Sequence, residues 1–275
     1  MRLPFRIANS AGHPIRGEVR APRDGADHGT IVFCHGFKGF WDWGGFPAFL
    51  DAAAARGYFA VGFSFSGSGV SSGDRVDEPE RFAGNTLSRE VDDVRDVVSA
   101  LRDRRLEPAG RDPGPIGVVG HSFGGGAAIL YASEDPRLGA VVGWAAVATA
   151  ARFSQEEIAR WRRDGWTTVV NTRTGQELRL AVSFLDDLET NRERLDIPKA
   201  AARLAAPLLL VHGDADQSVP LAEAESIARA SSAHLVVIPG AGHTFGAVHP
   251  YAGATPTYDR VIALTLDWFD RHLQR

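Results

Sequence analysis

The chain has 275 residues, of which 44% are hydrophobic and 23% are charged, and its formal net charge is −4. This composition is typical of a folded globular protein, because the apolar residues are numerous enough to offset the entropy lost on ordering the chain. The mild acidity argues against a nucleic-acid-binding protein, which normally presents a concentrated basic face. Because Cys34 is the only cysteine, an intrachain disulfide and a zinc site built from cysteine pairs are excluded.

The sequence contains no segment typical of a signal peptide or of a membrane span. The first residues are charged and soon alternate, without the apolar core that a signal peptide needs. The longest weakly polar run extends from Leu138 to Ala151 between two arginines, and it is too short to cross a bilayer. We therefore expect a cytoplasmic protein that does not associate with membranes.

Hydrophobic patterning predicts strands and helices in alternation. The chain opens with alternating segments at 5–8 and 15–21, which predict a β-hairpin. Further strands are predicted at 30–34, 58–65, 116–119, 140–147, 208–212 and 234–238, and helices at 46–56, 87–105, 123–132, 221–230 and 257–272. Consecutive parallel strands need crossover connections, and helices supply them. The pattern predicts an α/β fold whose mostly parallel central sheet is flanked by helices.

One connection is longer than the others. About sixty residues separate the strand at 140–147 from the strand at 208–212, which is more than a simple connection needs. This stretch predicts a helix at 154–163 with Ser154 and Glu157 as a capping box, a hairpin at 166–171 and 176–180, and a helix at 182–194. We interpret 149–206 as an inserted cap subdomain and assign 1–148 and 207–275 to the core domain.

A serine motif follows the strand at 116–119. Gly120-His121-Ser122-Phe123-Gly124 matches Gly-x-Ser-x-Gly and precedes an Ala-rich helix. That context is typical of a nucleophile elbow, a turn so tight that the neighbours of the serine must be small. A second match, Gly69 to Gly73 around Ser71, is followed by a polar loop with a proline and no predicted helix. We therefore choose Ser122 as the candidate nucleophile and reject Ser71.

A serine hydroxyl needs a base to remove its proton. His243 is the candidate, because it lies between glycines just past the last predicted strand, and His249 is its main rival. An acid is expected after the preceding strand, where Asp214 and Asp216 both occur. Asp216 is preferred because it stands further from the strand end and can turn back toward the histidine. Asp214 is expected to cap the turn through backbone amides.

The three candidates occur in the order Ser, Asp, His. That order, the strand-elbow-helix context and His35-Gly36-Phe37 after the strand at 30–34 resemble the α/β-hydrolase superfamily over essentially the whole chain. The resemblance implies an α/β-hydrolase fold. His-Gly-Phe, the run from His212 to Pro220 and a cap with a hairpin are similar to bacterial feruloyl or cinnamoyl esterases and to dienelactone-hydrolase-like proteins.

The resemblance also implies a role for each motif residue. Ser122 corresponds to the nucleophile, His243 to the general base and acid, and Asp216 to the carboxylate that orients the histidine. The backbone N–H groups of Phe37 and Phe123 correspond to the oxyanion hole. Acyl transfer on such a triad passes through a covalent serine ester and needs no metal and no organic cofactor.

These residues predict a serine esterase that acts on a small-molecule carboxylic ester. Aromatic residues in the cap and after the strand at 30–34 favour an aryl or hydroxycinnamoyl substrate, with Trp41, Trp166 and Phe184 as candidate substrate-binding residues. A peptidase, a thioesterase and a lactone hydrolase could use the same triad. A non-catalytic binding protein on this scaffold is a further alternative, disfavoured because the triad is complete.

Overall fold

The computed structural model describes residues 1–22, 26–106 and 112–273. Its strands are β1 (Arg2–Ala8), β2 (Pro14–Arg20), β3 (Thr30–Cys34), β4 (Phe59–Ser64), β5 (Ile116–His121), β6 (Ala140–Trp144), β7 (Trp166–Asn171), β8 (Gln176–Ala181), β9 (Leu208–Gly213) and β10 (His234–Ile238). Its helices are α1 (Phe46–Ala55), α2 (Pro79–Ala83), α3 (Leu87–Arg102), α4 (Phe123–Glu134), α5 (Gln155–Asp164), α6 (Ser183–Thr190), α7 (Ile197–Ala202), α8 (Leu221–Ala230) and α9 (Pro256–His272). None of the helices in these ranges combines the length and the apolarity that a membrane span requires.

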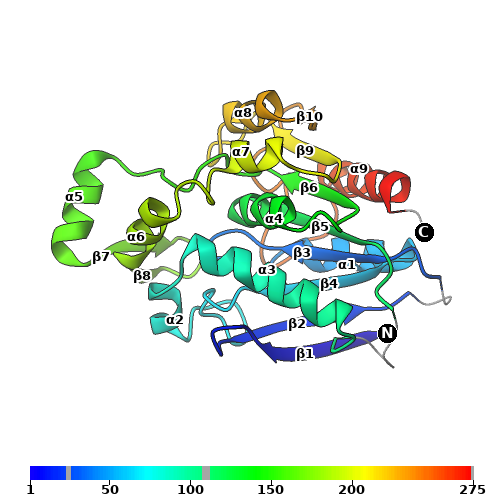
Figure 1. Cartoon of the computed structure of the whole chain (residues 1–275), viewed down its shortest axis with the longest axis horizontal. Helices are drawn as coiled ribbons and strands as arrows, with labels where there is room; N and C mark the ends of the chain where they lie inside the picture. Colours follow the sequence, from blue (N-terminus) through cyan, green and yellow to red (C-terminus); the bar gives the residue numbers. More distant parts are fainter. Residues whose placement is uncertain (23–25, 107–111, 274–275) are drawn as a thin grey trace.

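Most of the strands belong to one twisted sheet. Within the described residues this sheet has eight strands in the order β1-β2-β4-β3-β5-β6-β9-β10 (Figure 1). The pairs β1–β2 and β2–β4 are antiparallel, and every other neighbouring pair is parallel. The predicted mostly parallel sheet is therefore confirmed. Because β3, β5, β9 and β10 run in one direction, their carboxyl ends meet at one edge, where ligands bind in such sheets.

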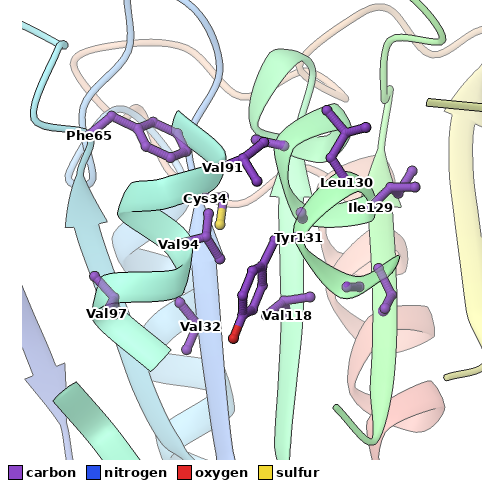
Figure 2. Packing of buried hydrophobic residues seen from close by; sticks show 14 of the residues in the cluster. Val32, Cys34, Phe65, Val91, Val94, Val97, Val118, Ile129, Leu130 and Tyr131 are labelled. Carbon is purple, nitrogen blue, oxygen red and sulfur yellow. The ribbon is translucent and has the colours of Figure 1, made fainter. Parts of the chain in front are cut away.

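Helices cover the sheet on both faces. One hydrophobic cluster joins the sheet to α3 and α4, and a second joins it to α1 and α9. In the first cluster, Val91 and Val94 of α3, Tyr131 of α4, Val32 of β3 and Val118 of β5 converge between helices and sheet (Figure 2). The central strands are buried throughout, which is typical of parallel sheets covered on both sides.

The segment between β6 and β9 contains α5, the hairpin β7–β8, α6 and α7. In Figure 1, α5, the hairpin and α6 extend from one end of the sheet, whereas α7 packs against α4 and α8 of the core. Trp161 of α5 and Phe184 of α6 belong to the same hydrophobic cluster as α3 and α4. The inserted segment thus shares its core with the main domain, and its role as a cap stays a prediction.

The structure corrects several predicted elements. The helix predicted at 182–194 is shorter, because α6 ends at Thr190 and Asp196 caps a new helix, α7, by accepting from the amide of Lys199. The loop predicted to contain no helix holds the short α2, where Phe82 is buried. The strand predicted at 140–147 ends at Trp144, because Ala145 has a φ of 45° in the left-handed region.

The turn from β5 into α4 leaves no room for a side chain at Gly120 or at Gly124. A Cβ added to Gly120 would lie 2.1 Å from the carbonyl O of Gly124, and one added to Gly124 would lie 2.2 Å from the carbonyl O of His35. Both obstacles are backbone atoms, which cannot rotate away. The beginning of α4 is therefore in close contact with its own turn and with the end of β3.

We expect Gly120→Ala to lower the free energy of unfolding by at least about 2 kcal/mol, because the new methyl group must displace backbone. Gly84→Ala is the matched control, since the nearest atom to a Cβ there is 3.5 Å away. Urea unfolding of both variants measures the difference. Equal stabilities would contradict the close approach at the elbow.

Candidate active site

Ser122 lies at the apex of the turn between β5 and α4. Its φ of 58° and ψ of −121° place a non-glycine residue in a sparsely populated region, which persists only where the surroundings hold it. Its N–H donates to the carbonyl O of Trp144 at 2.8 Å, and its carbonyl O accepts from the amides of Gly125 and Gly126. These bonds hold the backbone, so the serine side chain stands at the positive end of α4.

Asp216 and His243 come together from the loops after β9 and β10. His243 Nδ1 lies 2.8 Å from Asp216 Oδ2, and Asp216 Oδ1 accepts from the amides of Ser218 and Val219. Burial alone would raise the pKa of Asp216, but the hydrogen bonds from His243 and these amides outweigh it and hold the pKa below its usual value. The ionised carboxylate therefore keeps a proton on Nδ1 and leaves Nε2 free to accept one.

The rival residues make other contacts. Asp214 is exposed, and its Oδ1 accepts from the amide of Gly240 at 2.6 Å, so it bonds to the loop after β10 rather than to the backbone of its own turn. His249 Nδ1 accepts from the amide of Gly44 at 2.9 Å. The structure thus brings Asp216, rather than Asp214, to His243.

Ser122 and His243 line the same cavity, which has a volume of about 570 Å³. The other residues that line it are Gly36, Phe37, Lys38, Gly39, Trp43, Phe46, His121, Asn171, Thr172, Arg173, Thr244, Ala247, Val248 and His249. Its walls thus come from the loops after β3, β5 and β10 and from the turn of the β7–β8 hairpin. In the described part of the chain, no group of three or more His, Cys, Asp or Glu side chains is arranged to hold a metal ion.

The two backbone amides expected to form the oxyanion hole belong to Phe37, which lines the cavity, and to Phe123, which follows Ser122 in the chain. A Cβ on Gly36 would lie 3.0 Å from Ser122 Cβ, so the loop after β3 passes directly beside the serine. Within the described residues, the N–H groups of Phe37 and Phe123 have no acceptor. The rings of these two residues pack together with centroids 5.5 Å apart. Unpaired amides on both sides of a serine are the arrangement that an oxyanion hole requires.

Comparison with known proteins agrees with this architecture. A model of the alpha/beta hydrolase family matches residues 31–254. The chain belongs to the alpha/beta hydrolase family. The chain is also similar to an Escherichia coli protein, the uncharacterized 31.7 kDa protein in the traX-finO intergenic region. The two sequences are 23% identical, and the match covers 92% of this chain and 94% of that protein.

Solved structures show the same fold. The esterase domain from a Rhodothermus marinus protein is 20% identical with a TM-score of 0.69, and the match covers 99% of each chain. Est1E from Butyrivibrio proteoclasticus, with ferulic acid bound, is 18% identical with a TM-score of 0.71 over 97% of this chain and 96% of that chain. These similarities confirm the predicted α/β-hydrolase fold of this family member.

Two buried histidines of this alpha/beta hydrolase support the backbone around the cavity. His35 Nε2 accepts from the amide of Phe65 at 3.1 Å, so its Nδ1 donates to the carbonyl O of Gly36 at 2.8 Å. His121 Nε2 lies 2.9 Å from the carbonyl O of His243. Burial lowers the pKa of His35 to about 4 and that of His121 to about 3. Both are therefore neutral and hold the loops that carry the amides and the base.

The three aromatic residues predicted to bind substrate do not line the cavity. Trp41 packs against the hydrophobic cluster that includes α1. Trp166 is 39% exposed beneath the guanidinium of Arg179, and Phe184 is buried in a stack with Trp161. The aromatic residues that the cavity presents are instead Phe37, Trp43 and Phe46.

The hairpin turn contributes lining residues that the sequence did not single out. Asn171, Thr172 and Arg173 reach the cavity from the turn between β7 and β8. The Thr-Arg-Thr-Gly run correctly predicted that turn. Nothing local to the run could indicate that the hairpin folds back over the sheet edge, because that position depends on its contacts with other loops.

A buried acidic pair supports the same region. Asp93 Oδ2 accepts from the amide of Ser66 at 2.7 Å, next to the residue that hydrogen-bonds His35. Glu90 Oε1 accepts from Asn85 Nδ2 at 2.8 Å, whereas its Oε2 is buried and has no partner in the part of the chain that the structure describes. Burial raises the pKa of Glu90 to about 8 and that of Asp93 to about 6. Glu90 is therefore protonated at neutral pH.

We expect Glu90→Gln to gain stability over the wild-type protein as the pH rises from about 5 to about 8. The folded protein keeps the Glu90 proton up to a pKa of about 8, whereas the unfolded chain loses it near the ordinary glutamate pKa of 4.5. Wild-type unfolding free energy then falls by about 1.4 kcal/mol per pH unit through this window. Glutamine removes that slope.

Chemical denaturation across this pH range, with Glu80→Gln on the exposed surface of α2 as control, isolates the effect. Taking the difference between variant and wild type cancels the titration of the other groups. A difference between Glu90→Gln and wild type that stays constant with pH would contradict a buried, protonated Glu90.

Proposed function

We propose that the protein is a serine hydrolase that cleaves carboxylic esters through an acyl-enzyme intermediate. The observation that carries the proposal is the 2.8 Å hydrogen bond from His243 to Asp216 in the loops beside a cavity that Ser122 also lines. In this mechanism His243 Nε2 takes the Ser122 proton as Oγ attacks the ester carbonyl. Asp216 stabilises the imidazolium that forms.

The amides of Phe37 and Phe123 would bind the oxyanion of the tetrahedral intermediate. Each such donor contributes about 3 kcal/mol to transition-state stabilisation in serine hydrolases. The imidazolium then protonates the departing alcohol, and a water molecule repeats the cycle to release the acid. The buried neutral histidines His35 and His121 keep both loops in place, so little reorganisation is needed during the reaction.

An aryl or hydroxycinnamoyl ester is the substrate class that we favour. The cavity of about 570 Å³ lies within the range of small-molecule sites. Phe37, Trp43 and Phe46 line it and offer aromatic surface to a planar group. The structural neighbour with ferulic acid bound is a hydroxycinnamate-binding member of the same fold. This supports testing methyl ferulate beside p-nitrophenyl acetate.

Ser122→Ala should remain folded and lose at least about 1,000-fold in kcat for p-nitrophenyl acetate, because no other nucleophile stands at the elbow. Ser71→Ala is the matched control, since Ser71 occupies the second Gly-x-Ser-x-Gly match and its hydroxyl bonds to Asp77 instead. It should retain wild-type activity. Full activity in Ser122→Ala would refute the proposed nucleophile.

Asp216→Asn should lower kcat by about 1,000-fold or more, because the amide cannot hold the correct tautomer of His243 or stabilise its charged form. Asp214→Asn changes the neighbouring acid, which contacts only the loop backbone through Gly240. It should leave kcat within about twofold of wild type. Steady-state hydrolysis of both variants, with circular dichroism to check folding, decides between the acids.

A further inference from the structure

The cavity is positively charged although the whole chain carries a net charge of −4. Lys38, from the loop after β3, and Arg173, from the hairpin turn, both line it, and the lining contains no Asp or Glu within the described residues. The buried carboxylate of Asp216 already bonds to His243 and is not part of the cavity lining. Asp74 attracts Arg173 electrostatically, but its carboxylate is not part of the cavity lining.

The hydrogen bonds of these two cations leave donors unused. Lys38 Nζ donates to the carbonyl O of Val170 at 2.9 Å, and Arg173 Nη2 donates to the carbonyl O of Asp74 at 2.6 Å. Arg173 Nε is buried and has no acceptor in the described part of the chain. An arginine carries five N–H donors, so most of this capacity is free. Neither cation forms an ion pair with a described carboxylate.

The two charges also destabilise each other. Burial lowers the pKa of Lys38, and the positive charge of Arg173 lowers it further. Burial likewise lowers the pKa of Arg173, against a weaker attraction from Asp74. Two like charges held in a partly desolvated wall are costly unless an anion binds between or beside them.

Contacts with other parts of the chain hold Arg173 and its hairpin in position. Its guanidinium lies 5.0 Å from the centroid of the Phe40 ring. The hairpin that carries it is fastened to the loop before α2, where Gln176 Nε2 donates to the carbonyl O of Val76 at 2.8 Å and Oε1 accepts from its amide at 3.0 Å. A stacked, anchored arginine loses little freedom when it binds a ligand. The loop before α2 thus supports the hairpin.

Asn171 lines the same end of the cavity and holds the backbone of Arg173. The residue is 4% exposed, and its Nδ2 is buried with no acceptor among the described residues. Its Oδ1 accepts from the amide of Arg173 at 3.3 Å, which leaves Nδ2 as the unsatisfied end. Asn171 therefore helps to fix the backbone of the hairpin turn, and the two cations are the groups at this end of the cavity that favour an anion.

From these contacts we infer that the cavity selects esters that carry a carboxylate apart from the ester group, with Arg173 and Lys38 as the residues that bind it. This inference rests on the proposed function and names its substrate class. The second carboxylate stays unchanged while water adds across the ester bond. It could belong to the acyl part or to the alcohol part, and the two are separated experimentally.

Two matched substrate pairs distinguish these sources. On the acyl side, mono-p-nitrophenyl adipate is compared with its neutral terminal amide. On the alcohol side, 4-acetoxybenzoate is compared with 4-acetoxybenzamide. We expect the wild-type enzyme to prefer the anionic member of at least one pair by about tenfold in kcat/KM, the size of one charge-assisted hydrogen bond. Added salt should reduce the preference.

Arg173→Gln and Lys38→Gln should each reduce that preference, mainly through KM, and Arg179→Gln should keep it. Arg179 is the matched control because it lies on the same hairpin but stacks on Trp166, outside the cavity lining. Equal rates for the charged and neutral members of both pairs would overturn the inference. So would a preference that survives in both cavity variants.

A binding measurement keeps this result separate from catalysis. In Ser122→Ala, free adipate or 4-hydroxybenzoate should raise the thermal unfolding temperature more than adipamide or 4-hydroxybenzamide does. Adding Arg173→Gln should abolish the difference. If the carboxylates bind in this way but no ester is hydrolysed, the proposed function fails and the anion site stands. If esters are hydrolysed without any preference for carboxylates and without binding of carboxylates, the proposed function stands and the anion site fails.

Discussion

The close contact between the first turn of α4 and the end of β3 is the constraint on which the site depends. Only glycine fits at residue 124, because a Cβ there would lie 2.2 Å from the carbonyl O of His35. This contact places the loop after β3 beside the elbow, so the amides of Phe37 and Phe123 both lie near Ser122. One steric requirement therefore sets the position of the candidate nucleophile relative to the loop after β3.

Burial then separates the histidines by role. His35, His121 and His212 are buried, and each holds a backbone carbonyl or amide near the site: His212 Nε2, for example, lies 2.8 Å from the carbonyl O of Val219. His243 is less buried and has a carboxylate on Nδ1. A neutral buried imidazole serves as a rigid spacer with one donor and one acceptor. His212 Nε2 also lies 3.6 Å from Asp216 Oδ2, but His212 does not line the cavity. His243 both bonds to that carboxylate and lines the cavity that Ser122 lines.

Much of this architecture is predictable because the relevant signals are local. The strand Thr30–Cys34, the helix Leu221–Ala230 and the strand His234–Ile238 have their predicted bounds, since their apolar runs and flanking turns are unambiguous. The candidate Ser, Asp and His were found because each follows the end of a predicted strand. Short helices such as Pro79–Ala83 were missed, because a few residues carry too little periodicity to detect.

The segment between β6 and β9 was less predictable. The positions of its side chains depend on how the segment packs against the core, which the local sequence pattern does not show. Alternation shows that Trp166 lies on a strand but not which face of that strand meets the core. The position of Arg173 was equally hard to predict, because an arginine in a turn is usually a solvated surface residue. Its contact with Phe40 and its place in the cavity wall arise only when the hairpin folds over the sheet edge. The core elements thus supply the reactive groups from locally encoded turns. The insertion supplies charge through tertiary contacts, so selectivity could change through the hairpin while the elbow and the Asp216–His243 pair stay intact.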